Sequence, residues 1–337
     1  MYNFKRVFIE EAALKYDNAK KIKKIFEDRD VPVNIISSPQ GVRGIPGDDK
    51  EEIYRESKKT LVVGIRRSTK FQTCKPSAHY QLPIATSCPG MCRYCYLNTN
   101  LGKRPYIRTY VNIDEILAKA QKYIDERSPE ETIFEGAATS DPLPVEDLTG
   151  NLKESIKYFG KEPLGKFRFA TKFTDVDSLL GIDHNKSTEI RYSLNTEYVI
   201  NKYEENTPLL NKRVEASSKL ANVGYPVGFL IAPIITYPGW KKDYEELLLQ
   251  LRDKIGDDAE ISFELITHRY TTKAKNLINE TFPENDLPME EKDRRFKYGQ
   301  FGYGKYIYPP ETMSEIKKFF YDRIDKIFSN EKILYFV

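Results

Sequence analysis

Short apolar runs alternate with amphipathic stretches along most of this 337-residue chain. Beyond residue 80, six of the apolar runs have the composition of buried β-strands, and segments with helical spacing of apolar residues separate them. The six predicted strands are 82–86, 132–134, 166–170, 189–194, 226–232 and 261–265. Strands that alternate with helices form a parallel sheet with the helices outside it. Six units are too few to close an eight-stranded barrel, so the pattern predicts an α/β fold with a partial (β/α)6 barrel of the TIM type.

The same patterns outline the remaining elements and the domain organisation. They predict further strands at 60–65 and 333–337, and helices at 14–28, 113–124, 207–223, 244–255 and 311–327. Thr207 followed by a proline reads as the N-cap of its helix. We therefore expect an N-terminal α/β extension over 1–80, the barrel over 81–265 and a C-terminal extension over 266–337, all within one compact structural unit.

Composition favours a cytoplasmic protein without a membrane segment. Charged residues make up 31% of the chain and the mean hydropathy is −0.58. The longest apolar runs, such as 227–235, are too short to span a bilayer, and the first residues lack the apolar core of a signal peptide. The net charge of +3 does not by itself indicate a nucleic-acid-binding protein, so any DNA contact must come from a local patch of positive charge.

Three of the four cysteines lie within eight residues of each other. Cys88, Cys92 and Cys95 have the spacing C-x-x-x-C-x-x-C, which offers three thiolates to one site. A cubane iron–sulfur cluster held by three cysteines keeps one iron open for another ligand. The aromatic residue before the last cysteine, Tyr94, is typical of radical S-adenosylmethionine (SAM) enzymes. The alternative is a structural zinc site completed by Cys74.

Further segments in order along the chain resemble one family, the spore photoproduct lyases. The residues that carry this resemblance are the cysteine motif and the segments 75–78, 103–112, 139–141, 171–173, 224–226, 263–266, 268–269 and 304–308. The resemblance implies a radical SAM lyase that repairs a methylene-bridged thymine dimer, formed in spore DNA by ultraviolet light, by direct reversal to two thymines. It implies a 4Fe–4S cluster and SAM as cofactors, and a 5′-deoxyadenosyl radical that takes a hydrogen atom from the lesion.

The resemblance also assigns roles to individual residues. Cys88, Cys92 and Cys95 take the role of cluster ligands. Tyr94 and Tyr96 match tyrosines that relay the radical or contact the lesion, although either ring could instead pack over the cluster. Four polar residues at predicted strand ends match the SAM contacts: Ser140, Lys172, Ser193 and Asn195. The simpler interpretations are an Asp/Ser turn at Ser140 and a solvated lysine at Lys172.

One position departs from the family pattern. The family has a hydrogen-donor cysteine in the loop after the second barrel strand, and this chain has Ala138 there. An engineered substitution, a different donor or a paralogue with other chemistry would each explain the alanine. The neighbouring stretch 142–150 also differs from the family, which argues against a single engineered change. Cys74 stands where the family commonly has serine, and we expect it to donate the hydrogen atom from the other side of the same pocket.

A second region suggests contact with DNA. The stretch 294–306 interleaves basic residues, aromatic residues and glycines, a composition that suits phosphate contacts and stacking on a displaced base. The resemblance implies a DNA-opening hairpin here, with an arginine near its tip where this chain has Gln300. We expect the contacts to come from Lys297, Tyr303, Lys305, Arg104 and Arg108. A glycine-rich surface turn is the simpler interpretation.

The expected partners follow from the same resemblance. They are DNA that contains spore photoproduct and an electron donor of the flavodoxin or ferredoxin type, acting on a monomer in the spore core of an endospore-forming bacterium. Two other functions stay open at the level of sequence. One is a radical SAM paralogue with another nucleic-acid or small-molecule substrate, and the other is a zinc-stabilised DNA-binding protein without catalytic activity.

Overall fold

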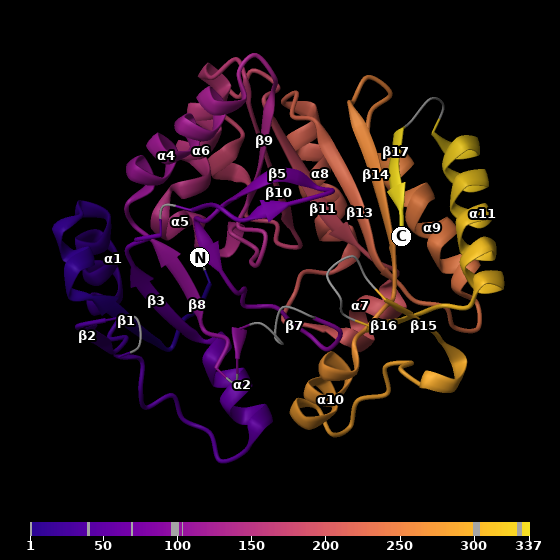
Figure 1. Ribbon diagram of the computed structural model, residues 1–337, viewed down its shortest axis with the longest axis horizontal. Helices are drawn as coiled ribbons and strands as arrows, with labels where there is room; N and C mark the ends of the chain where they lie inside the picture. The colour runs from indigo at the N-terminus through magenta and orange to yellow at the C-terminus, as the bar shows by residue number, and fades with distance from the viewer. Residues whose placement is uncertain are drawn as a thin grey trace. The chain divides into compact units, whose positions relative to one another are not determined.

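The protein is described by a computed structural model that covers residues 2–38, 41–68, 70–95, 101–102, 104–298, 304–328 and 332–337. The chain forms two compact units (Figure 1). The first comprises Met1–Pro89 and Leu101–Ile190, and the second comprises Gly90–Asn100 and Arg191–Val337. The chain therefore passes between the units at the cysteine motif and again within one strand. The domain boundaries at residues 80 and 265 stay a prediction.

The first unit begins with a five-stranded sheet in the order β2-β1-β3-β8-β6. Its strands are β1 (Arg6–Glu10), β2 (Val33–Ile36), β3 (Thr60–Gly64), β6 (Ala85–Thr86) and β8 (Ile107–Tyr110), with the helices η1 (Glu11–Lys15), α1 (Asp17–Glu27) and α2 (Lys50–Lys58). Strand β1 pairs in parallel with β2 and with β3, and β3 pairs in parallel with β8. Strand β6 runs antiparallel to β8. The strand expected at 60–65 and the helix expected at 14–28 are thus confirmed as β3 and α1.

The second part of this unit is the beginning of the barrel sheet, in the order β4, β5, β9, β10 and then the start of β11. Its elements are β4 (Thr73–Cys74), β5 (Ala78–Leu82), β9 (Thr132–Gly136), β10 (Gly165–Thr171), β11 (Thr188–Leu194), α4 (Ile113–Arg127), η3 (Leu143–Val145), α5 (Glu146–Thr149), α6 (Asn151–Lys161) and η4 (Asp177–Leu179). Helices α4 and α6 lie side by side (Figure 1). The rings of Phe159 on α6 and Phe167 on β10 stack at 5.4 Å, so aromatic residues join this helix layer to the sheet.

The second unit continues the barrel sheet from the end of β11 through β13, β14 and β17. Its elements are β7 (Met91–Cys92), α7 (Glu197–Tyr203), β12 (Glu204–Glu205), α8 (Leu210–Asn222), β13 (Val227–Ile234), α9 (Trp240–Lys254), β14 (Ile261–Thr267), α10 (Thr272–Thr281), η5 (Glu291–Asp293), β15 (Arg295–Tyr298), β16 (Gly304–Ile307), α11 (Pro310–Ile327) and β17 (Lys332–Phe336). Helices α9 and α11 pack together through edge-on contacts, Trp240 with Phe319 at 5.0 Å and Tyr244 with Phe320 at 5.2 Å. None of the described helices is both long and apolar enough to cross a membrane.

The six barrel strands expected from the sequence are present as β5, β9, β10, β11, β13 and β14, but the first was misplaced. Strand β5 ends at Leu82, and residues 85–86 form β6 in the other sheet. Pro83 follows Leu82 and has no N–H group to donate, so the ladder cannot continue through it. The N-cap expected at Thr207 is also wrong, because α8 begins at Leu210 and the Thr207 hydroxyl donates to the Glu204 carbonyl at 2.7 Å instead.

Candidate active site

The cysteine motif begins in the first unit, where buried groups hold Cys88 in place. The Lys58 ammonium group is almost completely buried and donates to the Cys88 carbonyl at 3.0 Å and to Ser87 Oγ at 3.2 Å. Ser87 adopts a positive φ of 62° and donates its hydroxyl to the Pro105 carbonyl at 2.7 Å. Few residues other than glycine adopt this conformation unless the surroundings impose it. The approach to the first cysteine is therefore rigidly defined.

The turn after β9 lies against this approach. Ala137 has a φ of 53° and donates its N–H to the Leu82 carbonyl at 2.9 Å, at the end of β5. Ser87 N–H donates to the Thr139 carbonyl at 2.9 Å, and the Ser140 hydroxyl donates to the Ser87 carbonyl. Ser140 is thus part of a turn, as its simpler interpretation held, and that turn contacts the residue before Cys88.

Asp141 connects the same turn to the end of β10. Its Oδ2 accepts from the Lys172 N–H at 2.7 Å and from the Thr171 hydroxyl at 3.0 Å, and its Oδ1 accepts from the Leu143 N–H at 3.2 Å. Burial raises the pKa of Asp141 to about 6, although these hydrogen bonds act in the opposite direction. Lys172 is half-buried just beyond β10. The first unit therefore brings Cys88, Ser140 and Lys172 together at the carboxyl ends of its strands.

The rest of the cysteine motif lies in the second unit. Strand β7 pairs antiparallel with β12, so that Cys92 lies opposite Glu204. The Arg93 N–H donates to the Tyr203 carbonyl at 2.9 Å, and the Cys95 N–H donates to the Cys92 carbonyl at 3.1 Å. The loop is therefore fixed to the segment that follows α7.

Tyr94 is tied to the same segment through its side chain. Its hydroxyl donates to the Glu204 carboxylate, and the other oxygen of that carboxylate accepts from Arg213 Nη2 at 2.6 Å. Burial, and then the Glu204 charge, raise the pKa of Tyr94 well above its usual value. The phenol therefore keeps its proton at neutral pH.

Ser193 and Asn195 lie at the end of β11 in this second unit. The Ser193 carbonyl accepts from Arg213 Nη1 at 3.0 Å. The Asn195 side chain is completely buried, donates to the Pro233 carbonyl at 2.8 Å and accepts from the Tyr244 hydroxyl at 2.8 Å. Asn195 thus joins β11 to β13 and α9 in addition to the SAM role expected of it.

The donor set of the motif fits a 4Fe–4S cluster. None of the four cysteines is in a disulfide, and three soft thiols on one short loop leave one iron of a cubane open. Within the described ranges no three His, Cys, Asp or Glu side chains are arranged as ligands of one metal ion, so the fit rests on the spacing and the chemistry of the thiols. Tyr96 lies outside the described residues.

Cys74 lies on β4, at one edge of the barrel sheet. It pairs with Ala78 at the start of β5, whereas Ala137, beside Ala138, is bonded to Leu82 at the end of that strand. A five-residue strand is about 13 Å long between its first and last Cα atoms. Cys74 and Ala138 are thus at opposite ends of β5.

The hairpin expected between residues 294 and 306 is confirmed as β15 and β16. Lys297 lies directly opposite Lys305, a like-charged pair that is unfavourable without a counter-ion. Burial, Arg269 and Lys297 together lower the pKa of Lys305. The Tyr298 side chain on the same hairpin is 74% exposed. Gln300, which stands where the resemblance implies an arginine, and Tyr303, a predicted DNA contact, lie outside the described residues.

The base of the hairpin is anchored by Arg294. Its guanidinium donates to the His268 carbonyl at 2.8 Å and the Pro288 carbonyl at 2.7 Å, and it stacks 3.8 Å from the centre of the Tyr308 ring. Burial and this arginine lower the pKa of His268 to about 3, so the histidine is neutral. Across the hairpin, Gly304 leaves room for a ring, because a Cβ there would lie 1.9 Å from the Phe296 side chain.

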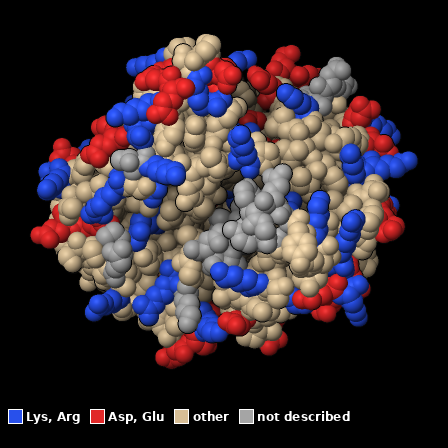
Figure 2. Space-filling view, in the orientation of Figure 1, with Lys and Arg blue, Asp and Glu red and all other residues tan. Residues whose placement is uncertain are grey.

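Two other predicted DNA contacts belong to the first unit. The Arg108 guanidinium bonds the Tyr106 hydroxyl at 2.9 Å and lies 5.4 Å from the centre of that ring, whereas Arg104 is exposed. Positive and negative side chains are interspersed over the face in Figure 2, in keeping with the small net charge. The opposed Lys297 and Lys305 of the hairpin are therefore a local concentration of positive charge.

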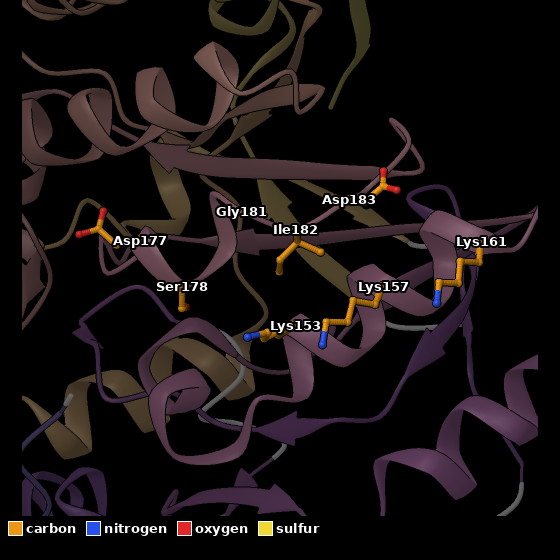
Figure 3. A pocket seen from close by; sticks show the side chains of 8 residues that line it. All are labelled: Lys153, Lys157, Lys161, Asp177, Ser178, Gly181, Ile182 and Asp183. Carbon is orange, nitrogen blue, oxygen red and sulfur yellow. The ribbon is translucent and has the colours of Figure 1, made fainter.

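A separate pocket of about 560 Å³ lies between α6 and the η4 turn (Figure 3). Its lining mixes three lysines with two aspartates: Lys153, Lys157, Lys161, Asp177 and Asp183, together with Ser178, Gly181 and Ile182. None of the residues predicted for the active site lines it. The pocket is open, and its lysine and aspartate charges partly neutralise each other. It therefore does not add to the candidate site.

Five residues of the site were not named as site residues from the sequence. Lys58, Glu204 and Arg213 hold the cysteine motif, Asp141 joins two strand ends, and Arg168 on β10 donates to the Ser77 carbonyl at 3.0 Å, close to Cys74 in the chain. Asp141 stood in a segment that resembles the family, but the other four sit in ordinary helix and strand patterns. Only their long-range contacts reveal them.

Comparison with known proteins identifies the family. The family model described as spore photoproduct lyase matches residues 2–337. The chain is 49% identical over 334 residues to the spore photoproduct lyase of Clostridium acetobutylicum, covering 99% of each chain, and 45% identical over 332 residues to that of Bacillus subtilis, covering 98% of this chain and 97% of the other.

A solved structure supports the same relationship. It is a variant spore photoproduct lyase, with one cysteine replaced by alanine and one serine by cysteine, that contains bound AdoMet (SAM) and dinucleoside spore photoproduct. It superposes with a TM-score of 0.95 at 42% identity and covers 100% of both chains. These similarities confirm the predicted α/β partial-barrel fold of the radical SAM type. They establish that this chain belongs to the spore photoproduct lyase family.

Proposed function

We propose that this protein repairs spore photoproduct in DNA by direct reversal to two thymines, with SAM and a 4Fe–4S cluster as cofactors. The observation that carries this proposal is a match over the whole chain to a family in which a solved member binds both AdoMet and dinucleoside spore photoproduct. The cysteine motif and the polar strand ends described above are the groups that this reaction requires.

When bound, the cluster and SAM supply the 5′-deoxyadenosyl radical that takes a hydrogen atom from the lesion. Cys88, Cys92 and Cys95 are the proposed ligands of the cluster. In the first unit, Ser140 and Lys172 lie on backbone held by Ser87 and Asp141, and in the second, Ser193 and Asn195 lie at the end of β11. We assign these four residues to SAM, because polar groups at the carboxyl ends of barrel strands are placed to bind a ligand.

We assign the hydrogen donor to Cys74. Opening of the methylene bridge leaves an allylic carbon radical on one thymine. The Cys74 S–H bond breaks, its hydrogen atom forms the new C–H bond, and a thiyl radical remains on sulfur. A tyrosine phenol, from Tyr94 or Tyr96, then gives a hydrogen atom to the thiyl and takes one from 5′-deoxyadenosine, which re-forms the radical needed to regenerate SAM.

Two observations support this donor. Ala138 has no weak S–H bond to break. In the variant structure with bound AdoMet and photoproduct, the introduced cysteine and the introduced alanine are separated by the same number of residues as Cys74 and Ala138 are here.

Cys74→Ala is expected to stop clean repair while lesion cleavage continues. The thymine radical then lacks its donor, so by-products replace thymine. In D2O the exchangeable S–D group of the unmodified enzyme labels the repaired methyl group, and the variant loses this label. Mass spectrometry of the products measures both effects.

The matched control returns the donor to the family position. Cys74→Ala combined with Ala138→Cys is expected to lower the amount of by-products to that of the unmodified enzyme. It is also expected to restore deuterium in the thymine methyl group. Clean repair with full labelling by the Cys74→Ala single variant would rule out Cys74 as the donor.

We assign DNA contacts to the hairpin, through Lys297, Tyr303 and Lys305, and to Arg104 and Arg108. The opposed lysines of β15 and β16 gain a counter-ion when a phosphate lies between them. Lys297→Gln and Lys305→Gln are each expected to weaken binding to duplex DNA. Each is also expected to reduce the magnitude of the slope of log binding constant against log salt concentration by about 1.

Fluorescence anisotropy at several salt concentrations measures this slope. Lys157→Gln in the pocket beside η4 is the control, because it removes the same charge from a helix outside the hairpin. Equal slopes for the hairpin variants and the control contradict the assignment.

The direct test of the function supplies DNA containing spore photoproduct, SAM and a reductant to the anaerobically reconstituted enzyme. Conversion of the lesion to two thymines in the DNA supports the proposal, and its absence with active SAM cleavage favours a paralogue with another substrate. A colourless protein that binds zinc instead of iron favours the DNA-binding alternative. We further propose that the enzyme acts as a monomer in the spore core and takes electrons from a flavodoxin or ferredoxin.

A further inference from the structure

Glu204 and Arg213 form a completely buried ion pair beside the cysteine motif. The two side chains have no exposed surface, and Arg213 Nη2 lies 2.6 Å from Glu204 Oε2. The other donors of the guanidinium bind the Pro208 carbonyl at 2.8 Å, the Ser193 carbonyl at 3.0 Å and the Thr207 hydroxyl at 2.8 Å. One side chain therefore connects the end of β11 to the segment that begins at β12.

The carboxylate extends this connection to the cysteine loop. Glu204 Oε1 accepts from the Tyr94 hydroxyl, and the Glu204 backbone pairs with that of Cys92. The loop is bonded to this segment by a ladder of two residues and by the Arg93 N–H. So short a ladder contributes little stability by itself. The tyrosine–glutamate contact adds the side-chain restraint that such a ladder lacks.

A buried ion pair of this kind is better suited to fixing geometry than to adding stability. Removing two charges from water costs several kcal/mol per ion, and well-packed apolar residues often replace such pairs without loss. The pair instead fixes side-chain orientation, because a planar guanidinium and a carboxylate hold each other and their further partners at defined angles.

We propose that Glu204 and Arg213 are a positioning pair for the reaction: they hold Tyr94 and the cluster loop in register with the SAM-binding end of β11. This inference rests on the proposed function, since it takes Cys92 and Cys95 as cluster ligands and Ser193 as a SAM contact. Groups that hold metal ligands in place tune a metal site almost as strongly as the ligands do.

The same unit contains a matched control. Arg191 Nη1 lies 3.0 and 3.2 Å from the two oxygens of Glu264, and the Tyr335 hydroxyl donates to Glu264 at 2.7 Å. Arg191 and Glu264 are likewise buried. This arginine, glutamate and tyrosine have the chemistry of the proposed group but lie on β11, β14 and β17, outside the cysteine loop.

The experiment compares Glu204→Gln and Tyr94→Phe with Glu264→Gln and Tyr335→Phe in the reconstituted holoenzyme. Three properties are measured: the rate at which a ferrous chelator removes iron, the change in the electron paramagnetic resonance spectrum of the reduced cluster on adding SAM, and melting temperature. None of the three requires lesion repair, so they report on the loop even if the enzyme acts on another substrate.

The first pair of variants is expected to lose iron about tenfold faster than the unmodified enzyme and to show an altered spectral change with SAM. The double variant is expected to show no more than the larger single effect, because both changes break one contact. The control variants are expected to lower the melting temperature by a similar amount and to leave iron release and the spectrum unchanged. Equal iron release and equal spectra in the two pairs would overturn the proposal. Tyr94→Phe removes only one oxygen, so it tests the contact even if Glu204→Gln does not fold.

Discussion

Replacing Cys92 with alanine is expected to abolish cluster binding and, with it, all SAM cleavage and lesion repair. Three thiolates are the fewest that hold a cubane with a single open iron, and two cysteines leave a second iron without a protein ligand. Cys92 is buried in β7, and its backbone pairs with Glu204. The variant keeps these backbone bonds, so the loss of activity reflects the missing ligand and not an unfolded loop.

Iron and sulfide content, visible absorption and the yield of repaired thymine in the DNA measure this effect after anaerobic reconstitution. Cys74→Ala is the control, and it is expected to retain the iron content and colour of the unmodified protein. If Cys74 were instead the fourth ligand of a zinc site, both variants would lose metal alike. A Cys92→Ala protein with a full complement of iron would show that the motif does not hold the cluster as we propose.

The barrel could be predicted from the sequence because its strands carry local information. The apolar runs that became β9, β10, β11, β13 and β14 are short, bounded and separated by amphipathic helices, which is the pattern of a parallel sheet. The first strand was misplaced because residues 79–81, His-Tyr-Gln, do not form an apolar run, whereas apolar residues stand on both sides of Pro83. Only the pairing of Ala78–Leu82 with β9 shows which residues belong to the barrel.

The candidate site was predictable only in part, for a physical reason. Cysteine spacing is a local pattern, so three ligands could be named from the chain alone. The groups that hold those ligands are distant in sequence: Lys58 contacts Cys88 across 30 residues, and Glu204 contacts Tyr94 across 110. A lysine near a helix end and a glutamate in a two-residue strand look like surface residues. Their burial follows from tertiary packing, which no local pattern records.

Replacing Arg168 with alanine is expected to lower the free energy of unfolding by about 3–5 kcal/mol, the cost of breaking a buried ion pair from one side. Arg168 Nε lies 3.3 Å from Glu189 and 3.9 Å from Glu135, on the strands that flank β10. Glu135 is 4% exposed and also accepts from the Ser77 hydroxyl at 2.8 Å. Without the arginine, the two carboxylates lose the cation between them and one of them is left in a site with little water.

Urea denaturation of the unmodified protein and the variant measures this difference. Lys157→Ala is the control, because its pair with Glu154 is exposed and is expected to change the free energy by less than about 1 kcal/mol. Arg168 Nη1 also donates to the Ser77 carbonyl, three residues from Cys74, so its loss loosens the turn that carries the proposed donor. The same variant is therefore expected to incorporate less deuterium into repaired thymine. A fully stable variant with unchanged labelling would show that the charges on β9, β10 and β11 neither support the sheet nor hold the Cys74 turn.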